Sequence, residues 1–247
     1  MSAPSIILQV PLLVLSAGVH QYAVKPPSKI PVIPRPPQQA TFLEKVEWVF
    51  MKVAAPWARV ERLEVHVVAL LEIMFIAGSQ YPFYKDYLPD VVTRTPLPAV
   101  PWNTMALRLT GILMQIAGGW IRITCHHYLG TAFTWNIHSA KPEDTKLVTS
   151  GPYSVVRHPS YTGRLMGQVG LSIYHLLPGS FVRESGMLHT WVGQLAFAFW
   201  IWSALAVTAI LSVLRPGVED AELQKRFGKE WEQWSERVRW KVIPGVW

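Results

Sequence analysis

A dense polar loop separates two apolar stretches of the chain: TKLVTSGPYSVVRHPSYTG, residues 145–163. Its cationic, hydroxyl and aromatic side chains are of the types that hold a polar ligand. Gly151 and Pro152 predict a turn, and Pro159 fits the first position of a helix, where its missing N–H breaks no hydrogen bond. His158 is therefore expected beside a helix N-terminus, whose unpaired N–H groups bind polar ligand atoms.

A second polar segment follows the last apolar stretch: RPGVEDAELQKRFGKEWEQW, residues 215–234. Glu219 and Asp220 open a predicted amphipathic helix, where acidic groups favour the positive end of the helix dipole. Apolar residues recur at helical spacing and form one face of this helix: Leu223, Phe227, Trp231 and Trp234. If the last two apolar stretches form a hairpin, both polar segments begin on the same side of the membrane and meet.

Taken alone, these residues suit a structural role as well as a functional one. Arg157 fits an anchor at the end of a span, His158 a loop residue with satisfied hydrogen bonds, and Tyr153 and Tyr161 interfacial anchors or the walls of a ligand site. Cys125 is the single cysteine, which excludes an internal disulfide. It lies beside His126 and His127, but consecutive residues do not converge easily on one ion, so we expect no metal site.

The rest of the chain is apolar enough to predict a membrane protein. Of its 247 residues, 50% are apolar and 12 are Trp, which is more than an ordinary soluble domain carries. A bilayer core of about 30 Å requires about 20 helical residues. The suitable apolar stretches are residues 4–24, 63–84, 105–124, 161–178 and 187–214. The sequence therefore predicts an all-α integral membrane protein with about five transmembrane helices.

The first and fourth stretches each depart from a simple span. Residues 4–24 have no positively charged segment before them, and the Pro-rich residues 25–39 lack a small-residue cleavage site, so we expect an anchor rather than a signal peptide. Residues 161–178 are short. The link PGSFVRESG at 178–186 is rich in helix breakers, which favours a helical hairpin of the last two spans.

Three regions follow from this division of the chain. Residues 1–62 hold the anchor span, the Pro-rich linker and a predicted interfacial helix that Pro56 interrupts. Residues 63–124 hold the second and third spans. Residues 125–247 hold the last two spans, the C-terminal cytosolic helix and both polar segments, so the candidate site is expected there.

The distribution of Lys and Arg predicts the topology. Eighteen of them fall in residues 25–62, 122–160 and 215–247, whereas Lys85, Arg94 and Arg183 occupy the other side. This asymmetry places the 125–160 loop and the C-terminal segment in the cytosol. The net charge of +7 then indicates affinity for anionic lipid headgroups. Nucleic acid is not an expected partner, because the basic residues form no continuous stripe.

The two polar segments resemble the isoprenylcysteine carboxyl methyltransferases of the endoplasmic reticulum, within the wider group of integral-membrane methyltransferases. The matching motifs are LVTSGPYSVVRHPSYTG at 147–163 and E-D-x-x-L-x-x-x-F-G-x-x-W-x-x-W at 219–234. Asp220 stands where the family commonly has a second Glu, and Trp231 and Trp234 stand where it commonly has Tyr. These changes keep charge and aromatic bulk but put a tyrosine-hydroxyl role in doubt.

The resemblance implies methyl transfer from S-adenosylmethionine to the C-terminal carboxylate of a prenylated cysteine, in a multi-pass protein of the endoplasmic reticulum membrane whose site faces the cytosol. Its expected partners are prenylated protein C-termini and membrane lipids. Residues 125–247 would be the methyltransferase catalytic region, and Arg215 matches the substrate-side, catalytic arginine. The implied cofactor contacts are His138, Thr145, Lys146, Leu147, Val148, Tyr153, His158, Pro159, Ser160, Tyr161 and Glu219.

Three other functions remain open from the sequence. A phospholipid N-methyltransferase shares the G-P-Y-x-x-x-R-H-P-x-Y-x-G pattern, although an amine acceptor suits an arginine at position 215 poorly. A sterol-reductase-like oxidoreductase has a similar loop and uses a nicotinamide cofactor, but residues 219–234 fit it less well. A non-enzymatic membrane scaffold explains the spans and the charges but not the paired polar segments.

Overall fold

The computed structural model describes residues 3–25, 39, 42–81, 83, 87, 99–130, 133 and 146–247. All regular secondary structure within these ranges is helical, which confirms the predicted all-α class. Two of the expected cofactor contacts, His138 and Thr145, lie outside the described residues.

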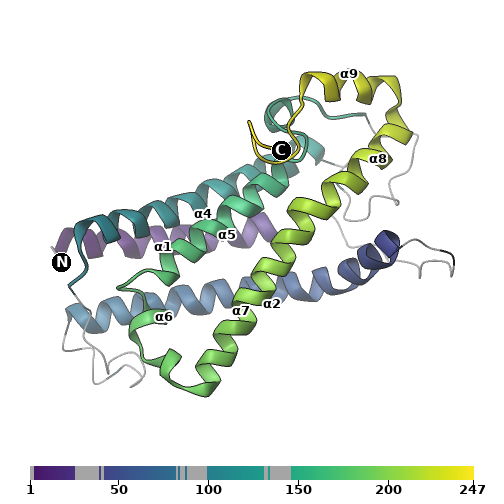
Figure 1. Ribbon diagram of the computed structural model, residues 1–247. Helices are drawn as coiled ribbons and strands as arrows, with labels where there is room; N and C mark the ends of the chain where they lie inside the picture. Colours follow the sequence, from purple (N-terminus) through teal and green to yellow (C-terminus); the bar gives the residue numbers. More distant parts are fainter. Residues whose placement is uncertain are drawn as a thin grey trace.

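The helices follow one another along the chain with short connections in the C-terminal half (Figure 1). The longer helices are α1 (Ala3–Val24), α2 (Phe42–Gln80), α4 (Trp102–Leu129), α5 (Pro159–Leu176), α7 (Trp191–Ala209), α8 (Arg215–Phe227) and α9 (Lys229–Arg237). The short elements are η5 (Gly151–Ser154), α6 (Phe181–Glu184), η6 (Met187–His189) and the π-helical segment η7 (Ile210–Leu214).

Within the described residues, one helix, Trp191–Phe227, is apolar and long enough to cross a membrane by length and composition, and Leu8–Val24 is a shorter apolar helix. The count of five spans stays a prediction. Charged side chains such as Glu72 and Arg108 lie inside α2 and α4, and they lower the mean hydropathy of those helices. The predicted interruption at Pro56 is wrong: α2 continues through it, so the interfacial helix and the second span form one helix.

Helices α4 and α5 form the most extensive helix pair, and α1 packs along α4 (Figure 1). Glycines allow the close approach of α4 and α5. A Cβ atom on Gly111 would lie 2.7 Å from the carbonyl oxygen of Gly170, and one on Gly118 would lie 2.7 Å from the backbone nitrogen of Gly167. Backbone therefore packs on backbone at this interface, which fixes the start of α5 relative to the end of α4.

A buried ion pair holds the end of the bundle where α5 finishes. The carboxylate of Glu72 accepts hydrogen bonds from Arg108 Nη2 at 2.6 Å and from the backbone N–H of Phe181 at 2.7 Å, and both charged side chains are fully buried. Since Phe181 begins α6, this carboxylate ties the turn after α5 to α2 and α4. Gly179 and Gly186 have positive φ values of 90° and 74°, which glycine adopts without strain.

The chain reverses through α6 and η6, so that α7 and η7 return to the end where α5 begins. Tyr161 near the start of α5 packs against Leu211 of η7 and Val242 of the C-terminal segment. Helix α9 and the C-terminal segment lie over this same end of the bundle (Figure 1). The reversal therefore brings the polar loop and the start of α8 together.

Candidate active site

The loop residue His158 is the N-cap of α5 and lies between two acidic residues of α8. Its Nδ1 is 3.0 Å from Glu219 Oε2, and its Nε2 is 3.0 Å from Asp220 Oδ1. The side chain is 4% exposed. Burial lowers the pKa of His158, but its hydrogen bonds to Asp220 and Glu219 outweigh burial and raise the pKa above the usual value. The geometry thus favours an imidazolium that donates to both carboxylates.

Tyr161 and Arg215 complete the contacts of Glu219. The Tyr161 hydroxyl donates a hydrogen bond to Glu219 Oε1, and its ring stacks on the His158 imidazole at a centroid distance of 5.7 Å. Arg215 Nη2 lies 3.7 Å from Glu219 Oε1. Arg215 itself is buried and is the first residue of α8, directly after the π-helical segment. One carboxylate therefore faces an imidazole, a phenol and a guanidinium.

Arg157 and the C-terminal segment hold the loop from its other side. Arg157 Nη2 donates to Asp220 Oδ2 at 3.0 Å, and Nη1 donates to the carbonyl of Val238 at 3.3 Å. The backbone N–H groups of Arg157 and His158 donate to the carbonyls of Trp240 and Lys241 at 2.9 and 2.8 Å. Arg157 is therefore part of the assembled site, in contrast to the anchor role that its sequence position also suited.

A buried aromatic cluster supports the loop beneath Gly151. Tyr153, Trp234 and Cys125 pack together, and Trp234 Nε1 donates to the Tyr153 carbonyl at 3.1 Å. Leu147 and Val148 pack against the edge of this cluster, so these two expected cofactor contacts supply backbone near the site rather than exposed side chains. Burial raises the pKa of Tyr153, which remains a neutral phenol.

Seven of the residues predicted from the sequence to form the site lie at this end of the bundle: Tyr153, His158, Pro159, Ser160, Tyr161, Arg215 and Glu219. Lys146 is exposed, whereas Leu147 and Val148 are half-buried. Whether these residues bind a cofactor stays a prediction.

Arg122 of α4 was missed in the sequence analysis. Its Nη1 donates to the carbonyl and the hydroxyl oxygen of Ser160, both at 3.2 Å, and its Nε donates to the carbonyl of Ala23 at 3.1 Å. The available signal was a charged residue at the end of the apolar stretch 105–124, where ionisable groups usually face the bundle interior. Arg122 links the loop to both α1 and α4.

No group of three or more His, Cys, Asp or Glu side chains within the described ranges is arranged to hold a metal ion. The chemistry available is that of acids, cations and hydrogen-bond donors. Glu219 is the most accessible carboxylate of the cluster, with 23% of its side chain exposed against 10% for Asp220. It therefore suits contact with a cationic ligand, while Arg215 beside it suits an anionic one.

Comparison with known proteins finds a family model and several relatives that match part of the chain. Residues 107–192 match the family model described as phospholipid methyltransferase. The chain is 31% identical over 128 residues to protein-S-isoprenylcysteine O-methyltransferase B of Arabidopsis thaliana, a match that covers 52% of this chain and 55% of that protein. It is also 31% identical over 153 residues to protein-S-isoprenylcysteine O-methyltransferase A of the same plant, covering 62% and 66%.

A sterol reductase is also among the relatives. The chain is 27% identical to the Delta(14)-sterol reductase ERG24B of Gibberella zeae over a match that covers 41% of this chain and 24% of that protein. The chain spans about half the length of the first of these proteins, protein-S-isoprenylcysteine O-methyltransferase B. No solved structure matches the chain significantly. These matches confirm the resemblance to the isoprenylcysteine carboxyl methyltransferases.

Proposed function

We propose that the chain transfers a methyl group from S-adenosylmethionine to the C-terminal carboxylate of a prenylated cysteine. The observation that carries this proposal is the convergence of His158, Glu219 and Arg215 at one end of the bundle, from two segments that are far apart in the sequence. Those segments carry the motifs of the family resemblance, and several of the relatives are named for this reaction.

The residues of the site fit a cationic, amino-acid-like cofactor. Glu219 offers an accessible carboxylate, and residues 146–148 form an irregular segment of the loop that leads to His158. Hydrogen bonds from His158 and Tyr161 position the Glu219 carboxylate, and the bond from Trp234 to the Tyr153 carbonyl holds the loop, so we infer that the site is preorganised for its ligand. When bound, the cofactor supplies an electrophilic methyl group on a sulfonium.

The acceptor requires positioning rather than deprotonation. An α-carboxyl group has a pKa near 3.5, so at neutral pH it is already the nucleophile. The guanidinium of Arg215 can hold a carboxylate through two parallel N–H bonds and so align it with the methyl group. Since an anion and a cation react to give neutral products, the partly dry surroundings of Arg215 do not oppose the reaction.

The setting we propose is the endoplasmic reticulum membrane, with the site facing the cytosol. The charge asymmetry of the loops supports this orientation. Prenylated protein C-termini are the proposed partners, and they reach the site from the bilayer. Methylation would remove a negative charge beside an anionic leaflet and so strengthen membrane anchoring by the prenyl chain.

A phospholipid N-methyltransferase is the second candidate, because the matching family model carries that description. The position of Arg215 disfavours it, since a buried guanidinium repels a protonated amine acceptor. The sterol-reductase relative supports an oxidoreductase more weakly, because the match covers a quarter of that protein.

Two binding and activity measurements on purified protein test the proposal. S-adenosylmethionine is expected to bind and NADPH is not; the opposite result would favour the reductase. Methyl transfer is expected to an S-prenylcysteine derivative and not to phosphatidylethanolamine. Transfer to phosphatidylethanolamine alone would replace the proposed function with the second candidate.

A further inference from the structure

An apolar and basic surface lies on the C-terminal segment, residues 238–247, which follows α9. Four large apolar side chains of this segment are 36–71% exposed: Trp240, Ile243, Val246 and Trp247. Arg239 beside them is exposed as well. We call these five residues the C-terminal surface. Exposed apolar side chains that cluster together mark a site of contact, and Trp next to cations is typical of the boundary between membrane and water.

The packing of Val242 gives the level of this surface relative to a membrane. Val242 is fully buried and packs against Tyr161 and Leu211. The helix Trp191–Phe227 is apolar and long enough to cross a bilayer. From Trp191 to Leu211 it rises by about 30 Å over about 20 residues, which equals the thickness of the bilayer core. With Trp191 at one edge of the core, Leu211 and the adjoining Val242 lie at the other edge.

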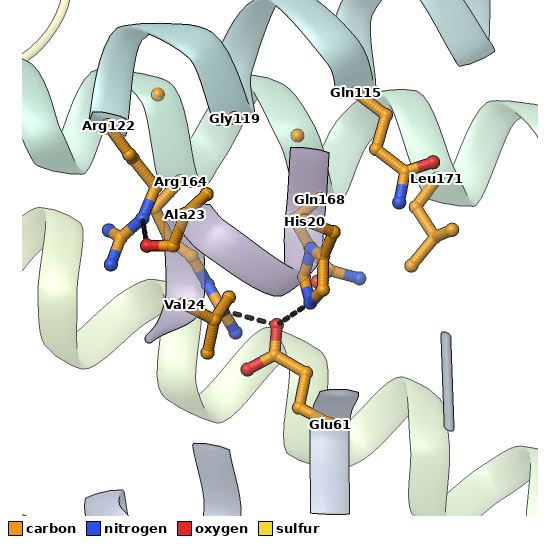
Figure 2. A pocket seen from close by; sticks show the side chains of 12 residues that line it. His20, Ala23, Val24, Glu61, Gln115, Gly119, Arg122, Arg164, Gln168 and Leu171 are labelled. Atoms are coloured by element: carbon orange, nitrogen blue, oxygen red, sulfur yellow. Dashed lines mark hydrogen bonds and ion pairs between the residues drawn. The ribbon is translucent and has the colours of Figure 1, made fainter. Parts of the chain in front are cut away.

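The shorter apolar helix Leu8–Val24 ends at the same level. Arg122 Nε donates to the carbonyl of Ala23 near the end of α1, as Figure 2 shows. Arg122 Nη1 donates to the carbonyl of Ser160, directly before Tyr161. Since Tyr161 packs against the C-terminal segment, two apolar helices end in the layer that this segment occupies. The C-terminal surface therefore begins at the polar edge of the bilayer core.

The same segment is joined to the polar loop of the candidate active site through Lys241. The backbone N–H of His158 donates to the carbonyl of Lys241 at 2.8 Å. Lys241 Nζ lies 3.8 Å from Asp220 Oδ2, and Asp220 also faces the imidazole of His158. On its other side, the ammonium lies 5.4 Å from the centroid of the Trp247 ring. A contact made by Trp247 therefore bears directly on the residues that hold His158.

We propose that the C-terminal surface rests on the headgroup layer of an anionic leaflet and that this contact holds the segment against the loop, so that anionic lipid strengthens cofactor binding. Trp240 and Trp247 suit the headgroup level, and Arg239 attracts anionic headgroups. Lipid is the occupant that reaches this level, because Val213 and Leu214 continue the exposed apolar face of α7 up to it. The contact is independent of the proposed function, whereas its effect on the cofactor rests on that function.

A fluorescent label on the surface tests the contact. Val246→Cys allows attachment of a nitrobenzoxadiazole group, because the native thiol of Cys125 is buried. In vesicles of phosphatidylcholine and phosphatidylserine, a lipid with a doxyl group beside its headgroup should quench this label strongly. The matched control is Lys225→Cys, which is exposed and lies about 15 Å along α8 beyond Arg215, so its label should be quenched little. Equal quenching at both positions overturns the contact, and an unquenched label at position 246 leaves the surface to a protein partner instead.

The dependence of S-adenosylmethionine affinity on lipid charge tests the effect on the site. Adding phosphatidylserine to phosphatidylcholine vesicles should tighten binding about fivefold, the effect expected of one cation at an anionic surface. Arg239→Gln should lose most of this gain, and Lys225→Gln should keep it. A gain that survives Arg239→Gln shows only attraction of the cationic cofactor to the vesicles and overturns the effect on the site. Absence of cofactor binding in all vesicles overturns the proposed function and this effect together, while quenching of the label still decides the contact.

Discussion

The imidazole of His158 and the carboxylate of Glu219 are 3.0 Å apart, although 61 positions separate the two residues in the sequence. His158 ends the polar loop, and Glu219 lies in the first turns of α8. Asp220 holds the other ring nitrogen at the same distance. This arrangement joins the loop to the C-terminal helix, and anything that weakens it separates the two halves of the candidate site.

The pH dependence of stability should report the charge on His158. Its pKa is raised in the folded protein, so its contribution to stability is fully present below the unfolded value of about 6.5 and is lost as the pH rises through the folded value. We expect the melting temperature in detergent to fall from about pH 6.5 upward. His158→Asn should be less stable at low pH and should lose most of this slope. An identical slope in the variant would show that other groups are responsible.

Substitution of Arg215 should separate a catalytic role from a structural one. If Arg215 positions the acceptor carboxylate, Arg215→Ala should lower methyl transfer about a hundredfold or more, on the order of 3 kcal/mol of transition-state stabilisation, with cofactor affinity nearly intact. Arg215→Lys should recover little, because an ammonium cannot form two parallel bonds. The exposed Arg237 provides a control for loss of one positive charge. Near-normal turnover in Arg215→Lys would instead identify a membrane anchor.

The glycine contacts between α4 and α5 predict a large difference between two Gly→Ala variants. In Gly111→Ala, the new methyl group would lie 2.7 Å from the carbonyl oxygen of Gly170 and 3.0 Å from the backbone nitrogen of Tyr174, so the helices must move apart. We expect a loss of about 1–3 kcal/mol in unfolding free energy. Gly217→Ala meets open space in α8 and should be neutral or slightly stabilising. Equal melting temperatures for the two variants would contradict the packing of α4 on α5.

The charge asymmetry predicts the side of the membrane on which the site lies. A glycosylation acceptor appended after Trp247 should stay unmodified in microsomes, because the C-terminal segment carries an excess of Lys and Arg. The same acceptor inserted between Pro89 and Asp90, in the loop assigned to the other side, is the positive control and should be modified. Efficient modification after Trp247 would reverse the proposed orientation.

The all-α class and the meeting of the two polar segments could be predicted from the sequence. Apolar stretches indicate the helices, and the breaker-rich links between them indicate where the chain reverses. His158, Tyr161 and Glu219 were found for this reason, whereas the role of Arg215 was predicted from the family resemblance. Continuity of α2 through Pro56 was missed, since a proline signals a break but does not require one when the surrounding turns remain paired.

The partners of buried cations were also missed. Arg122 contacts Ser160, and Arg164 pairs with Glu61, across helices that are far apart in the chain. Periodicity indicates that a helix exists and which of its faces is apolar, but not which residue of another helix faces a given side chain. Arg164 stands in the short apolar stretch 161–178, and its partner depends on the packing of α2.

The most direct test of the account is a double-mutant cycle on S-adenosylmethionine binding with His158→Ala, Glu219→Ala and the double variant. Each single variant should bind the cofactor at least about tenfold more weakly, because each disrupts the same loop-to-helix contact. The double variant should lose clearly less than the sum of the two losses in binding free energy, since groups that serve one ligand are coupled. Strictly additive losses, or normal affinity in either well-folded single variant, would contradict a single cofactor site built by His158 and Glu219.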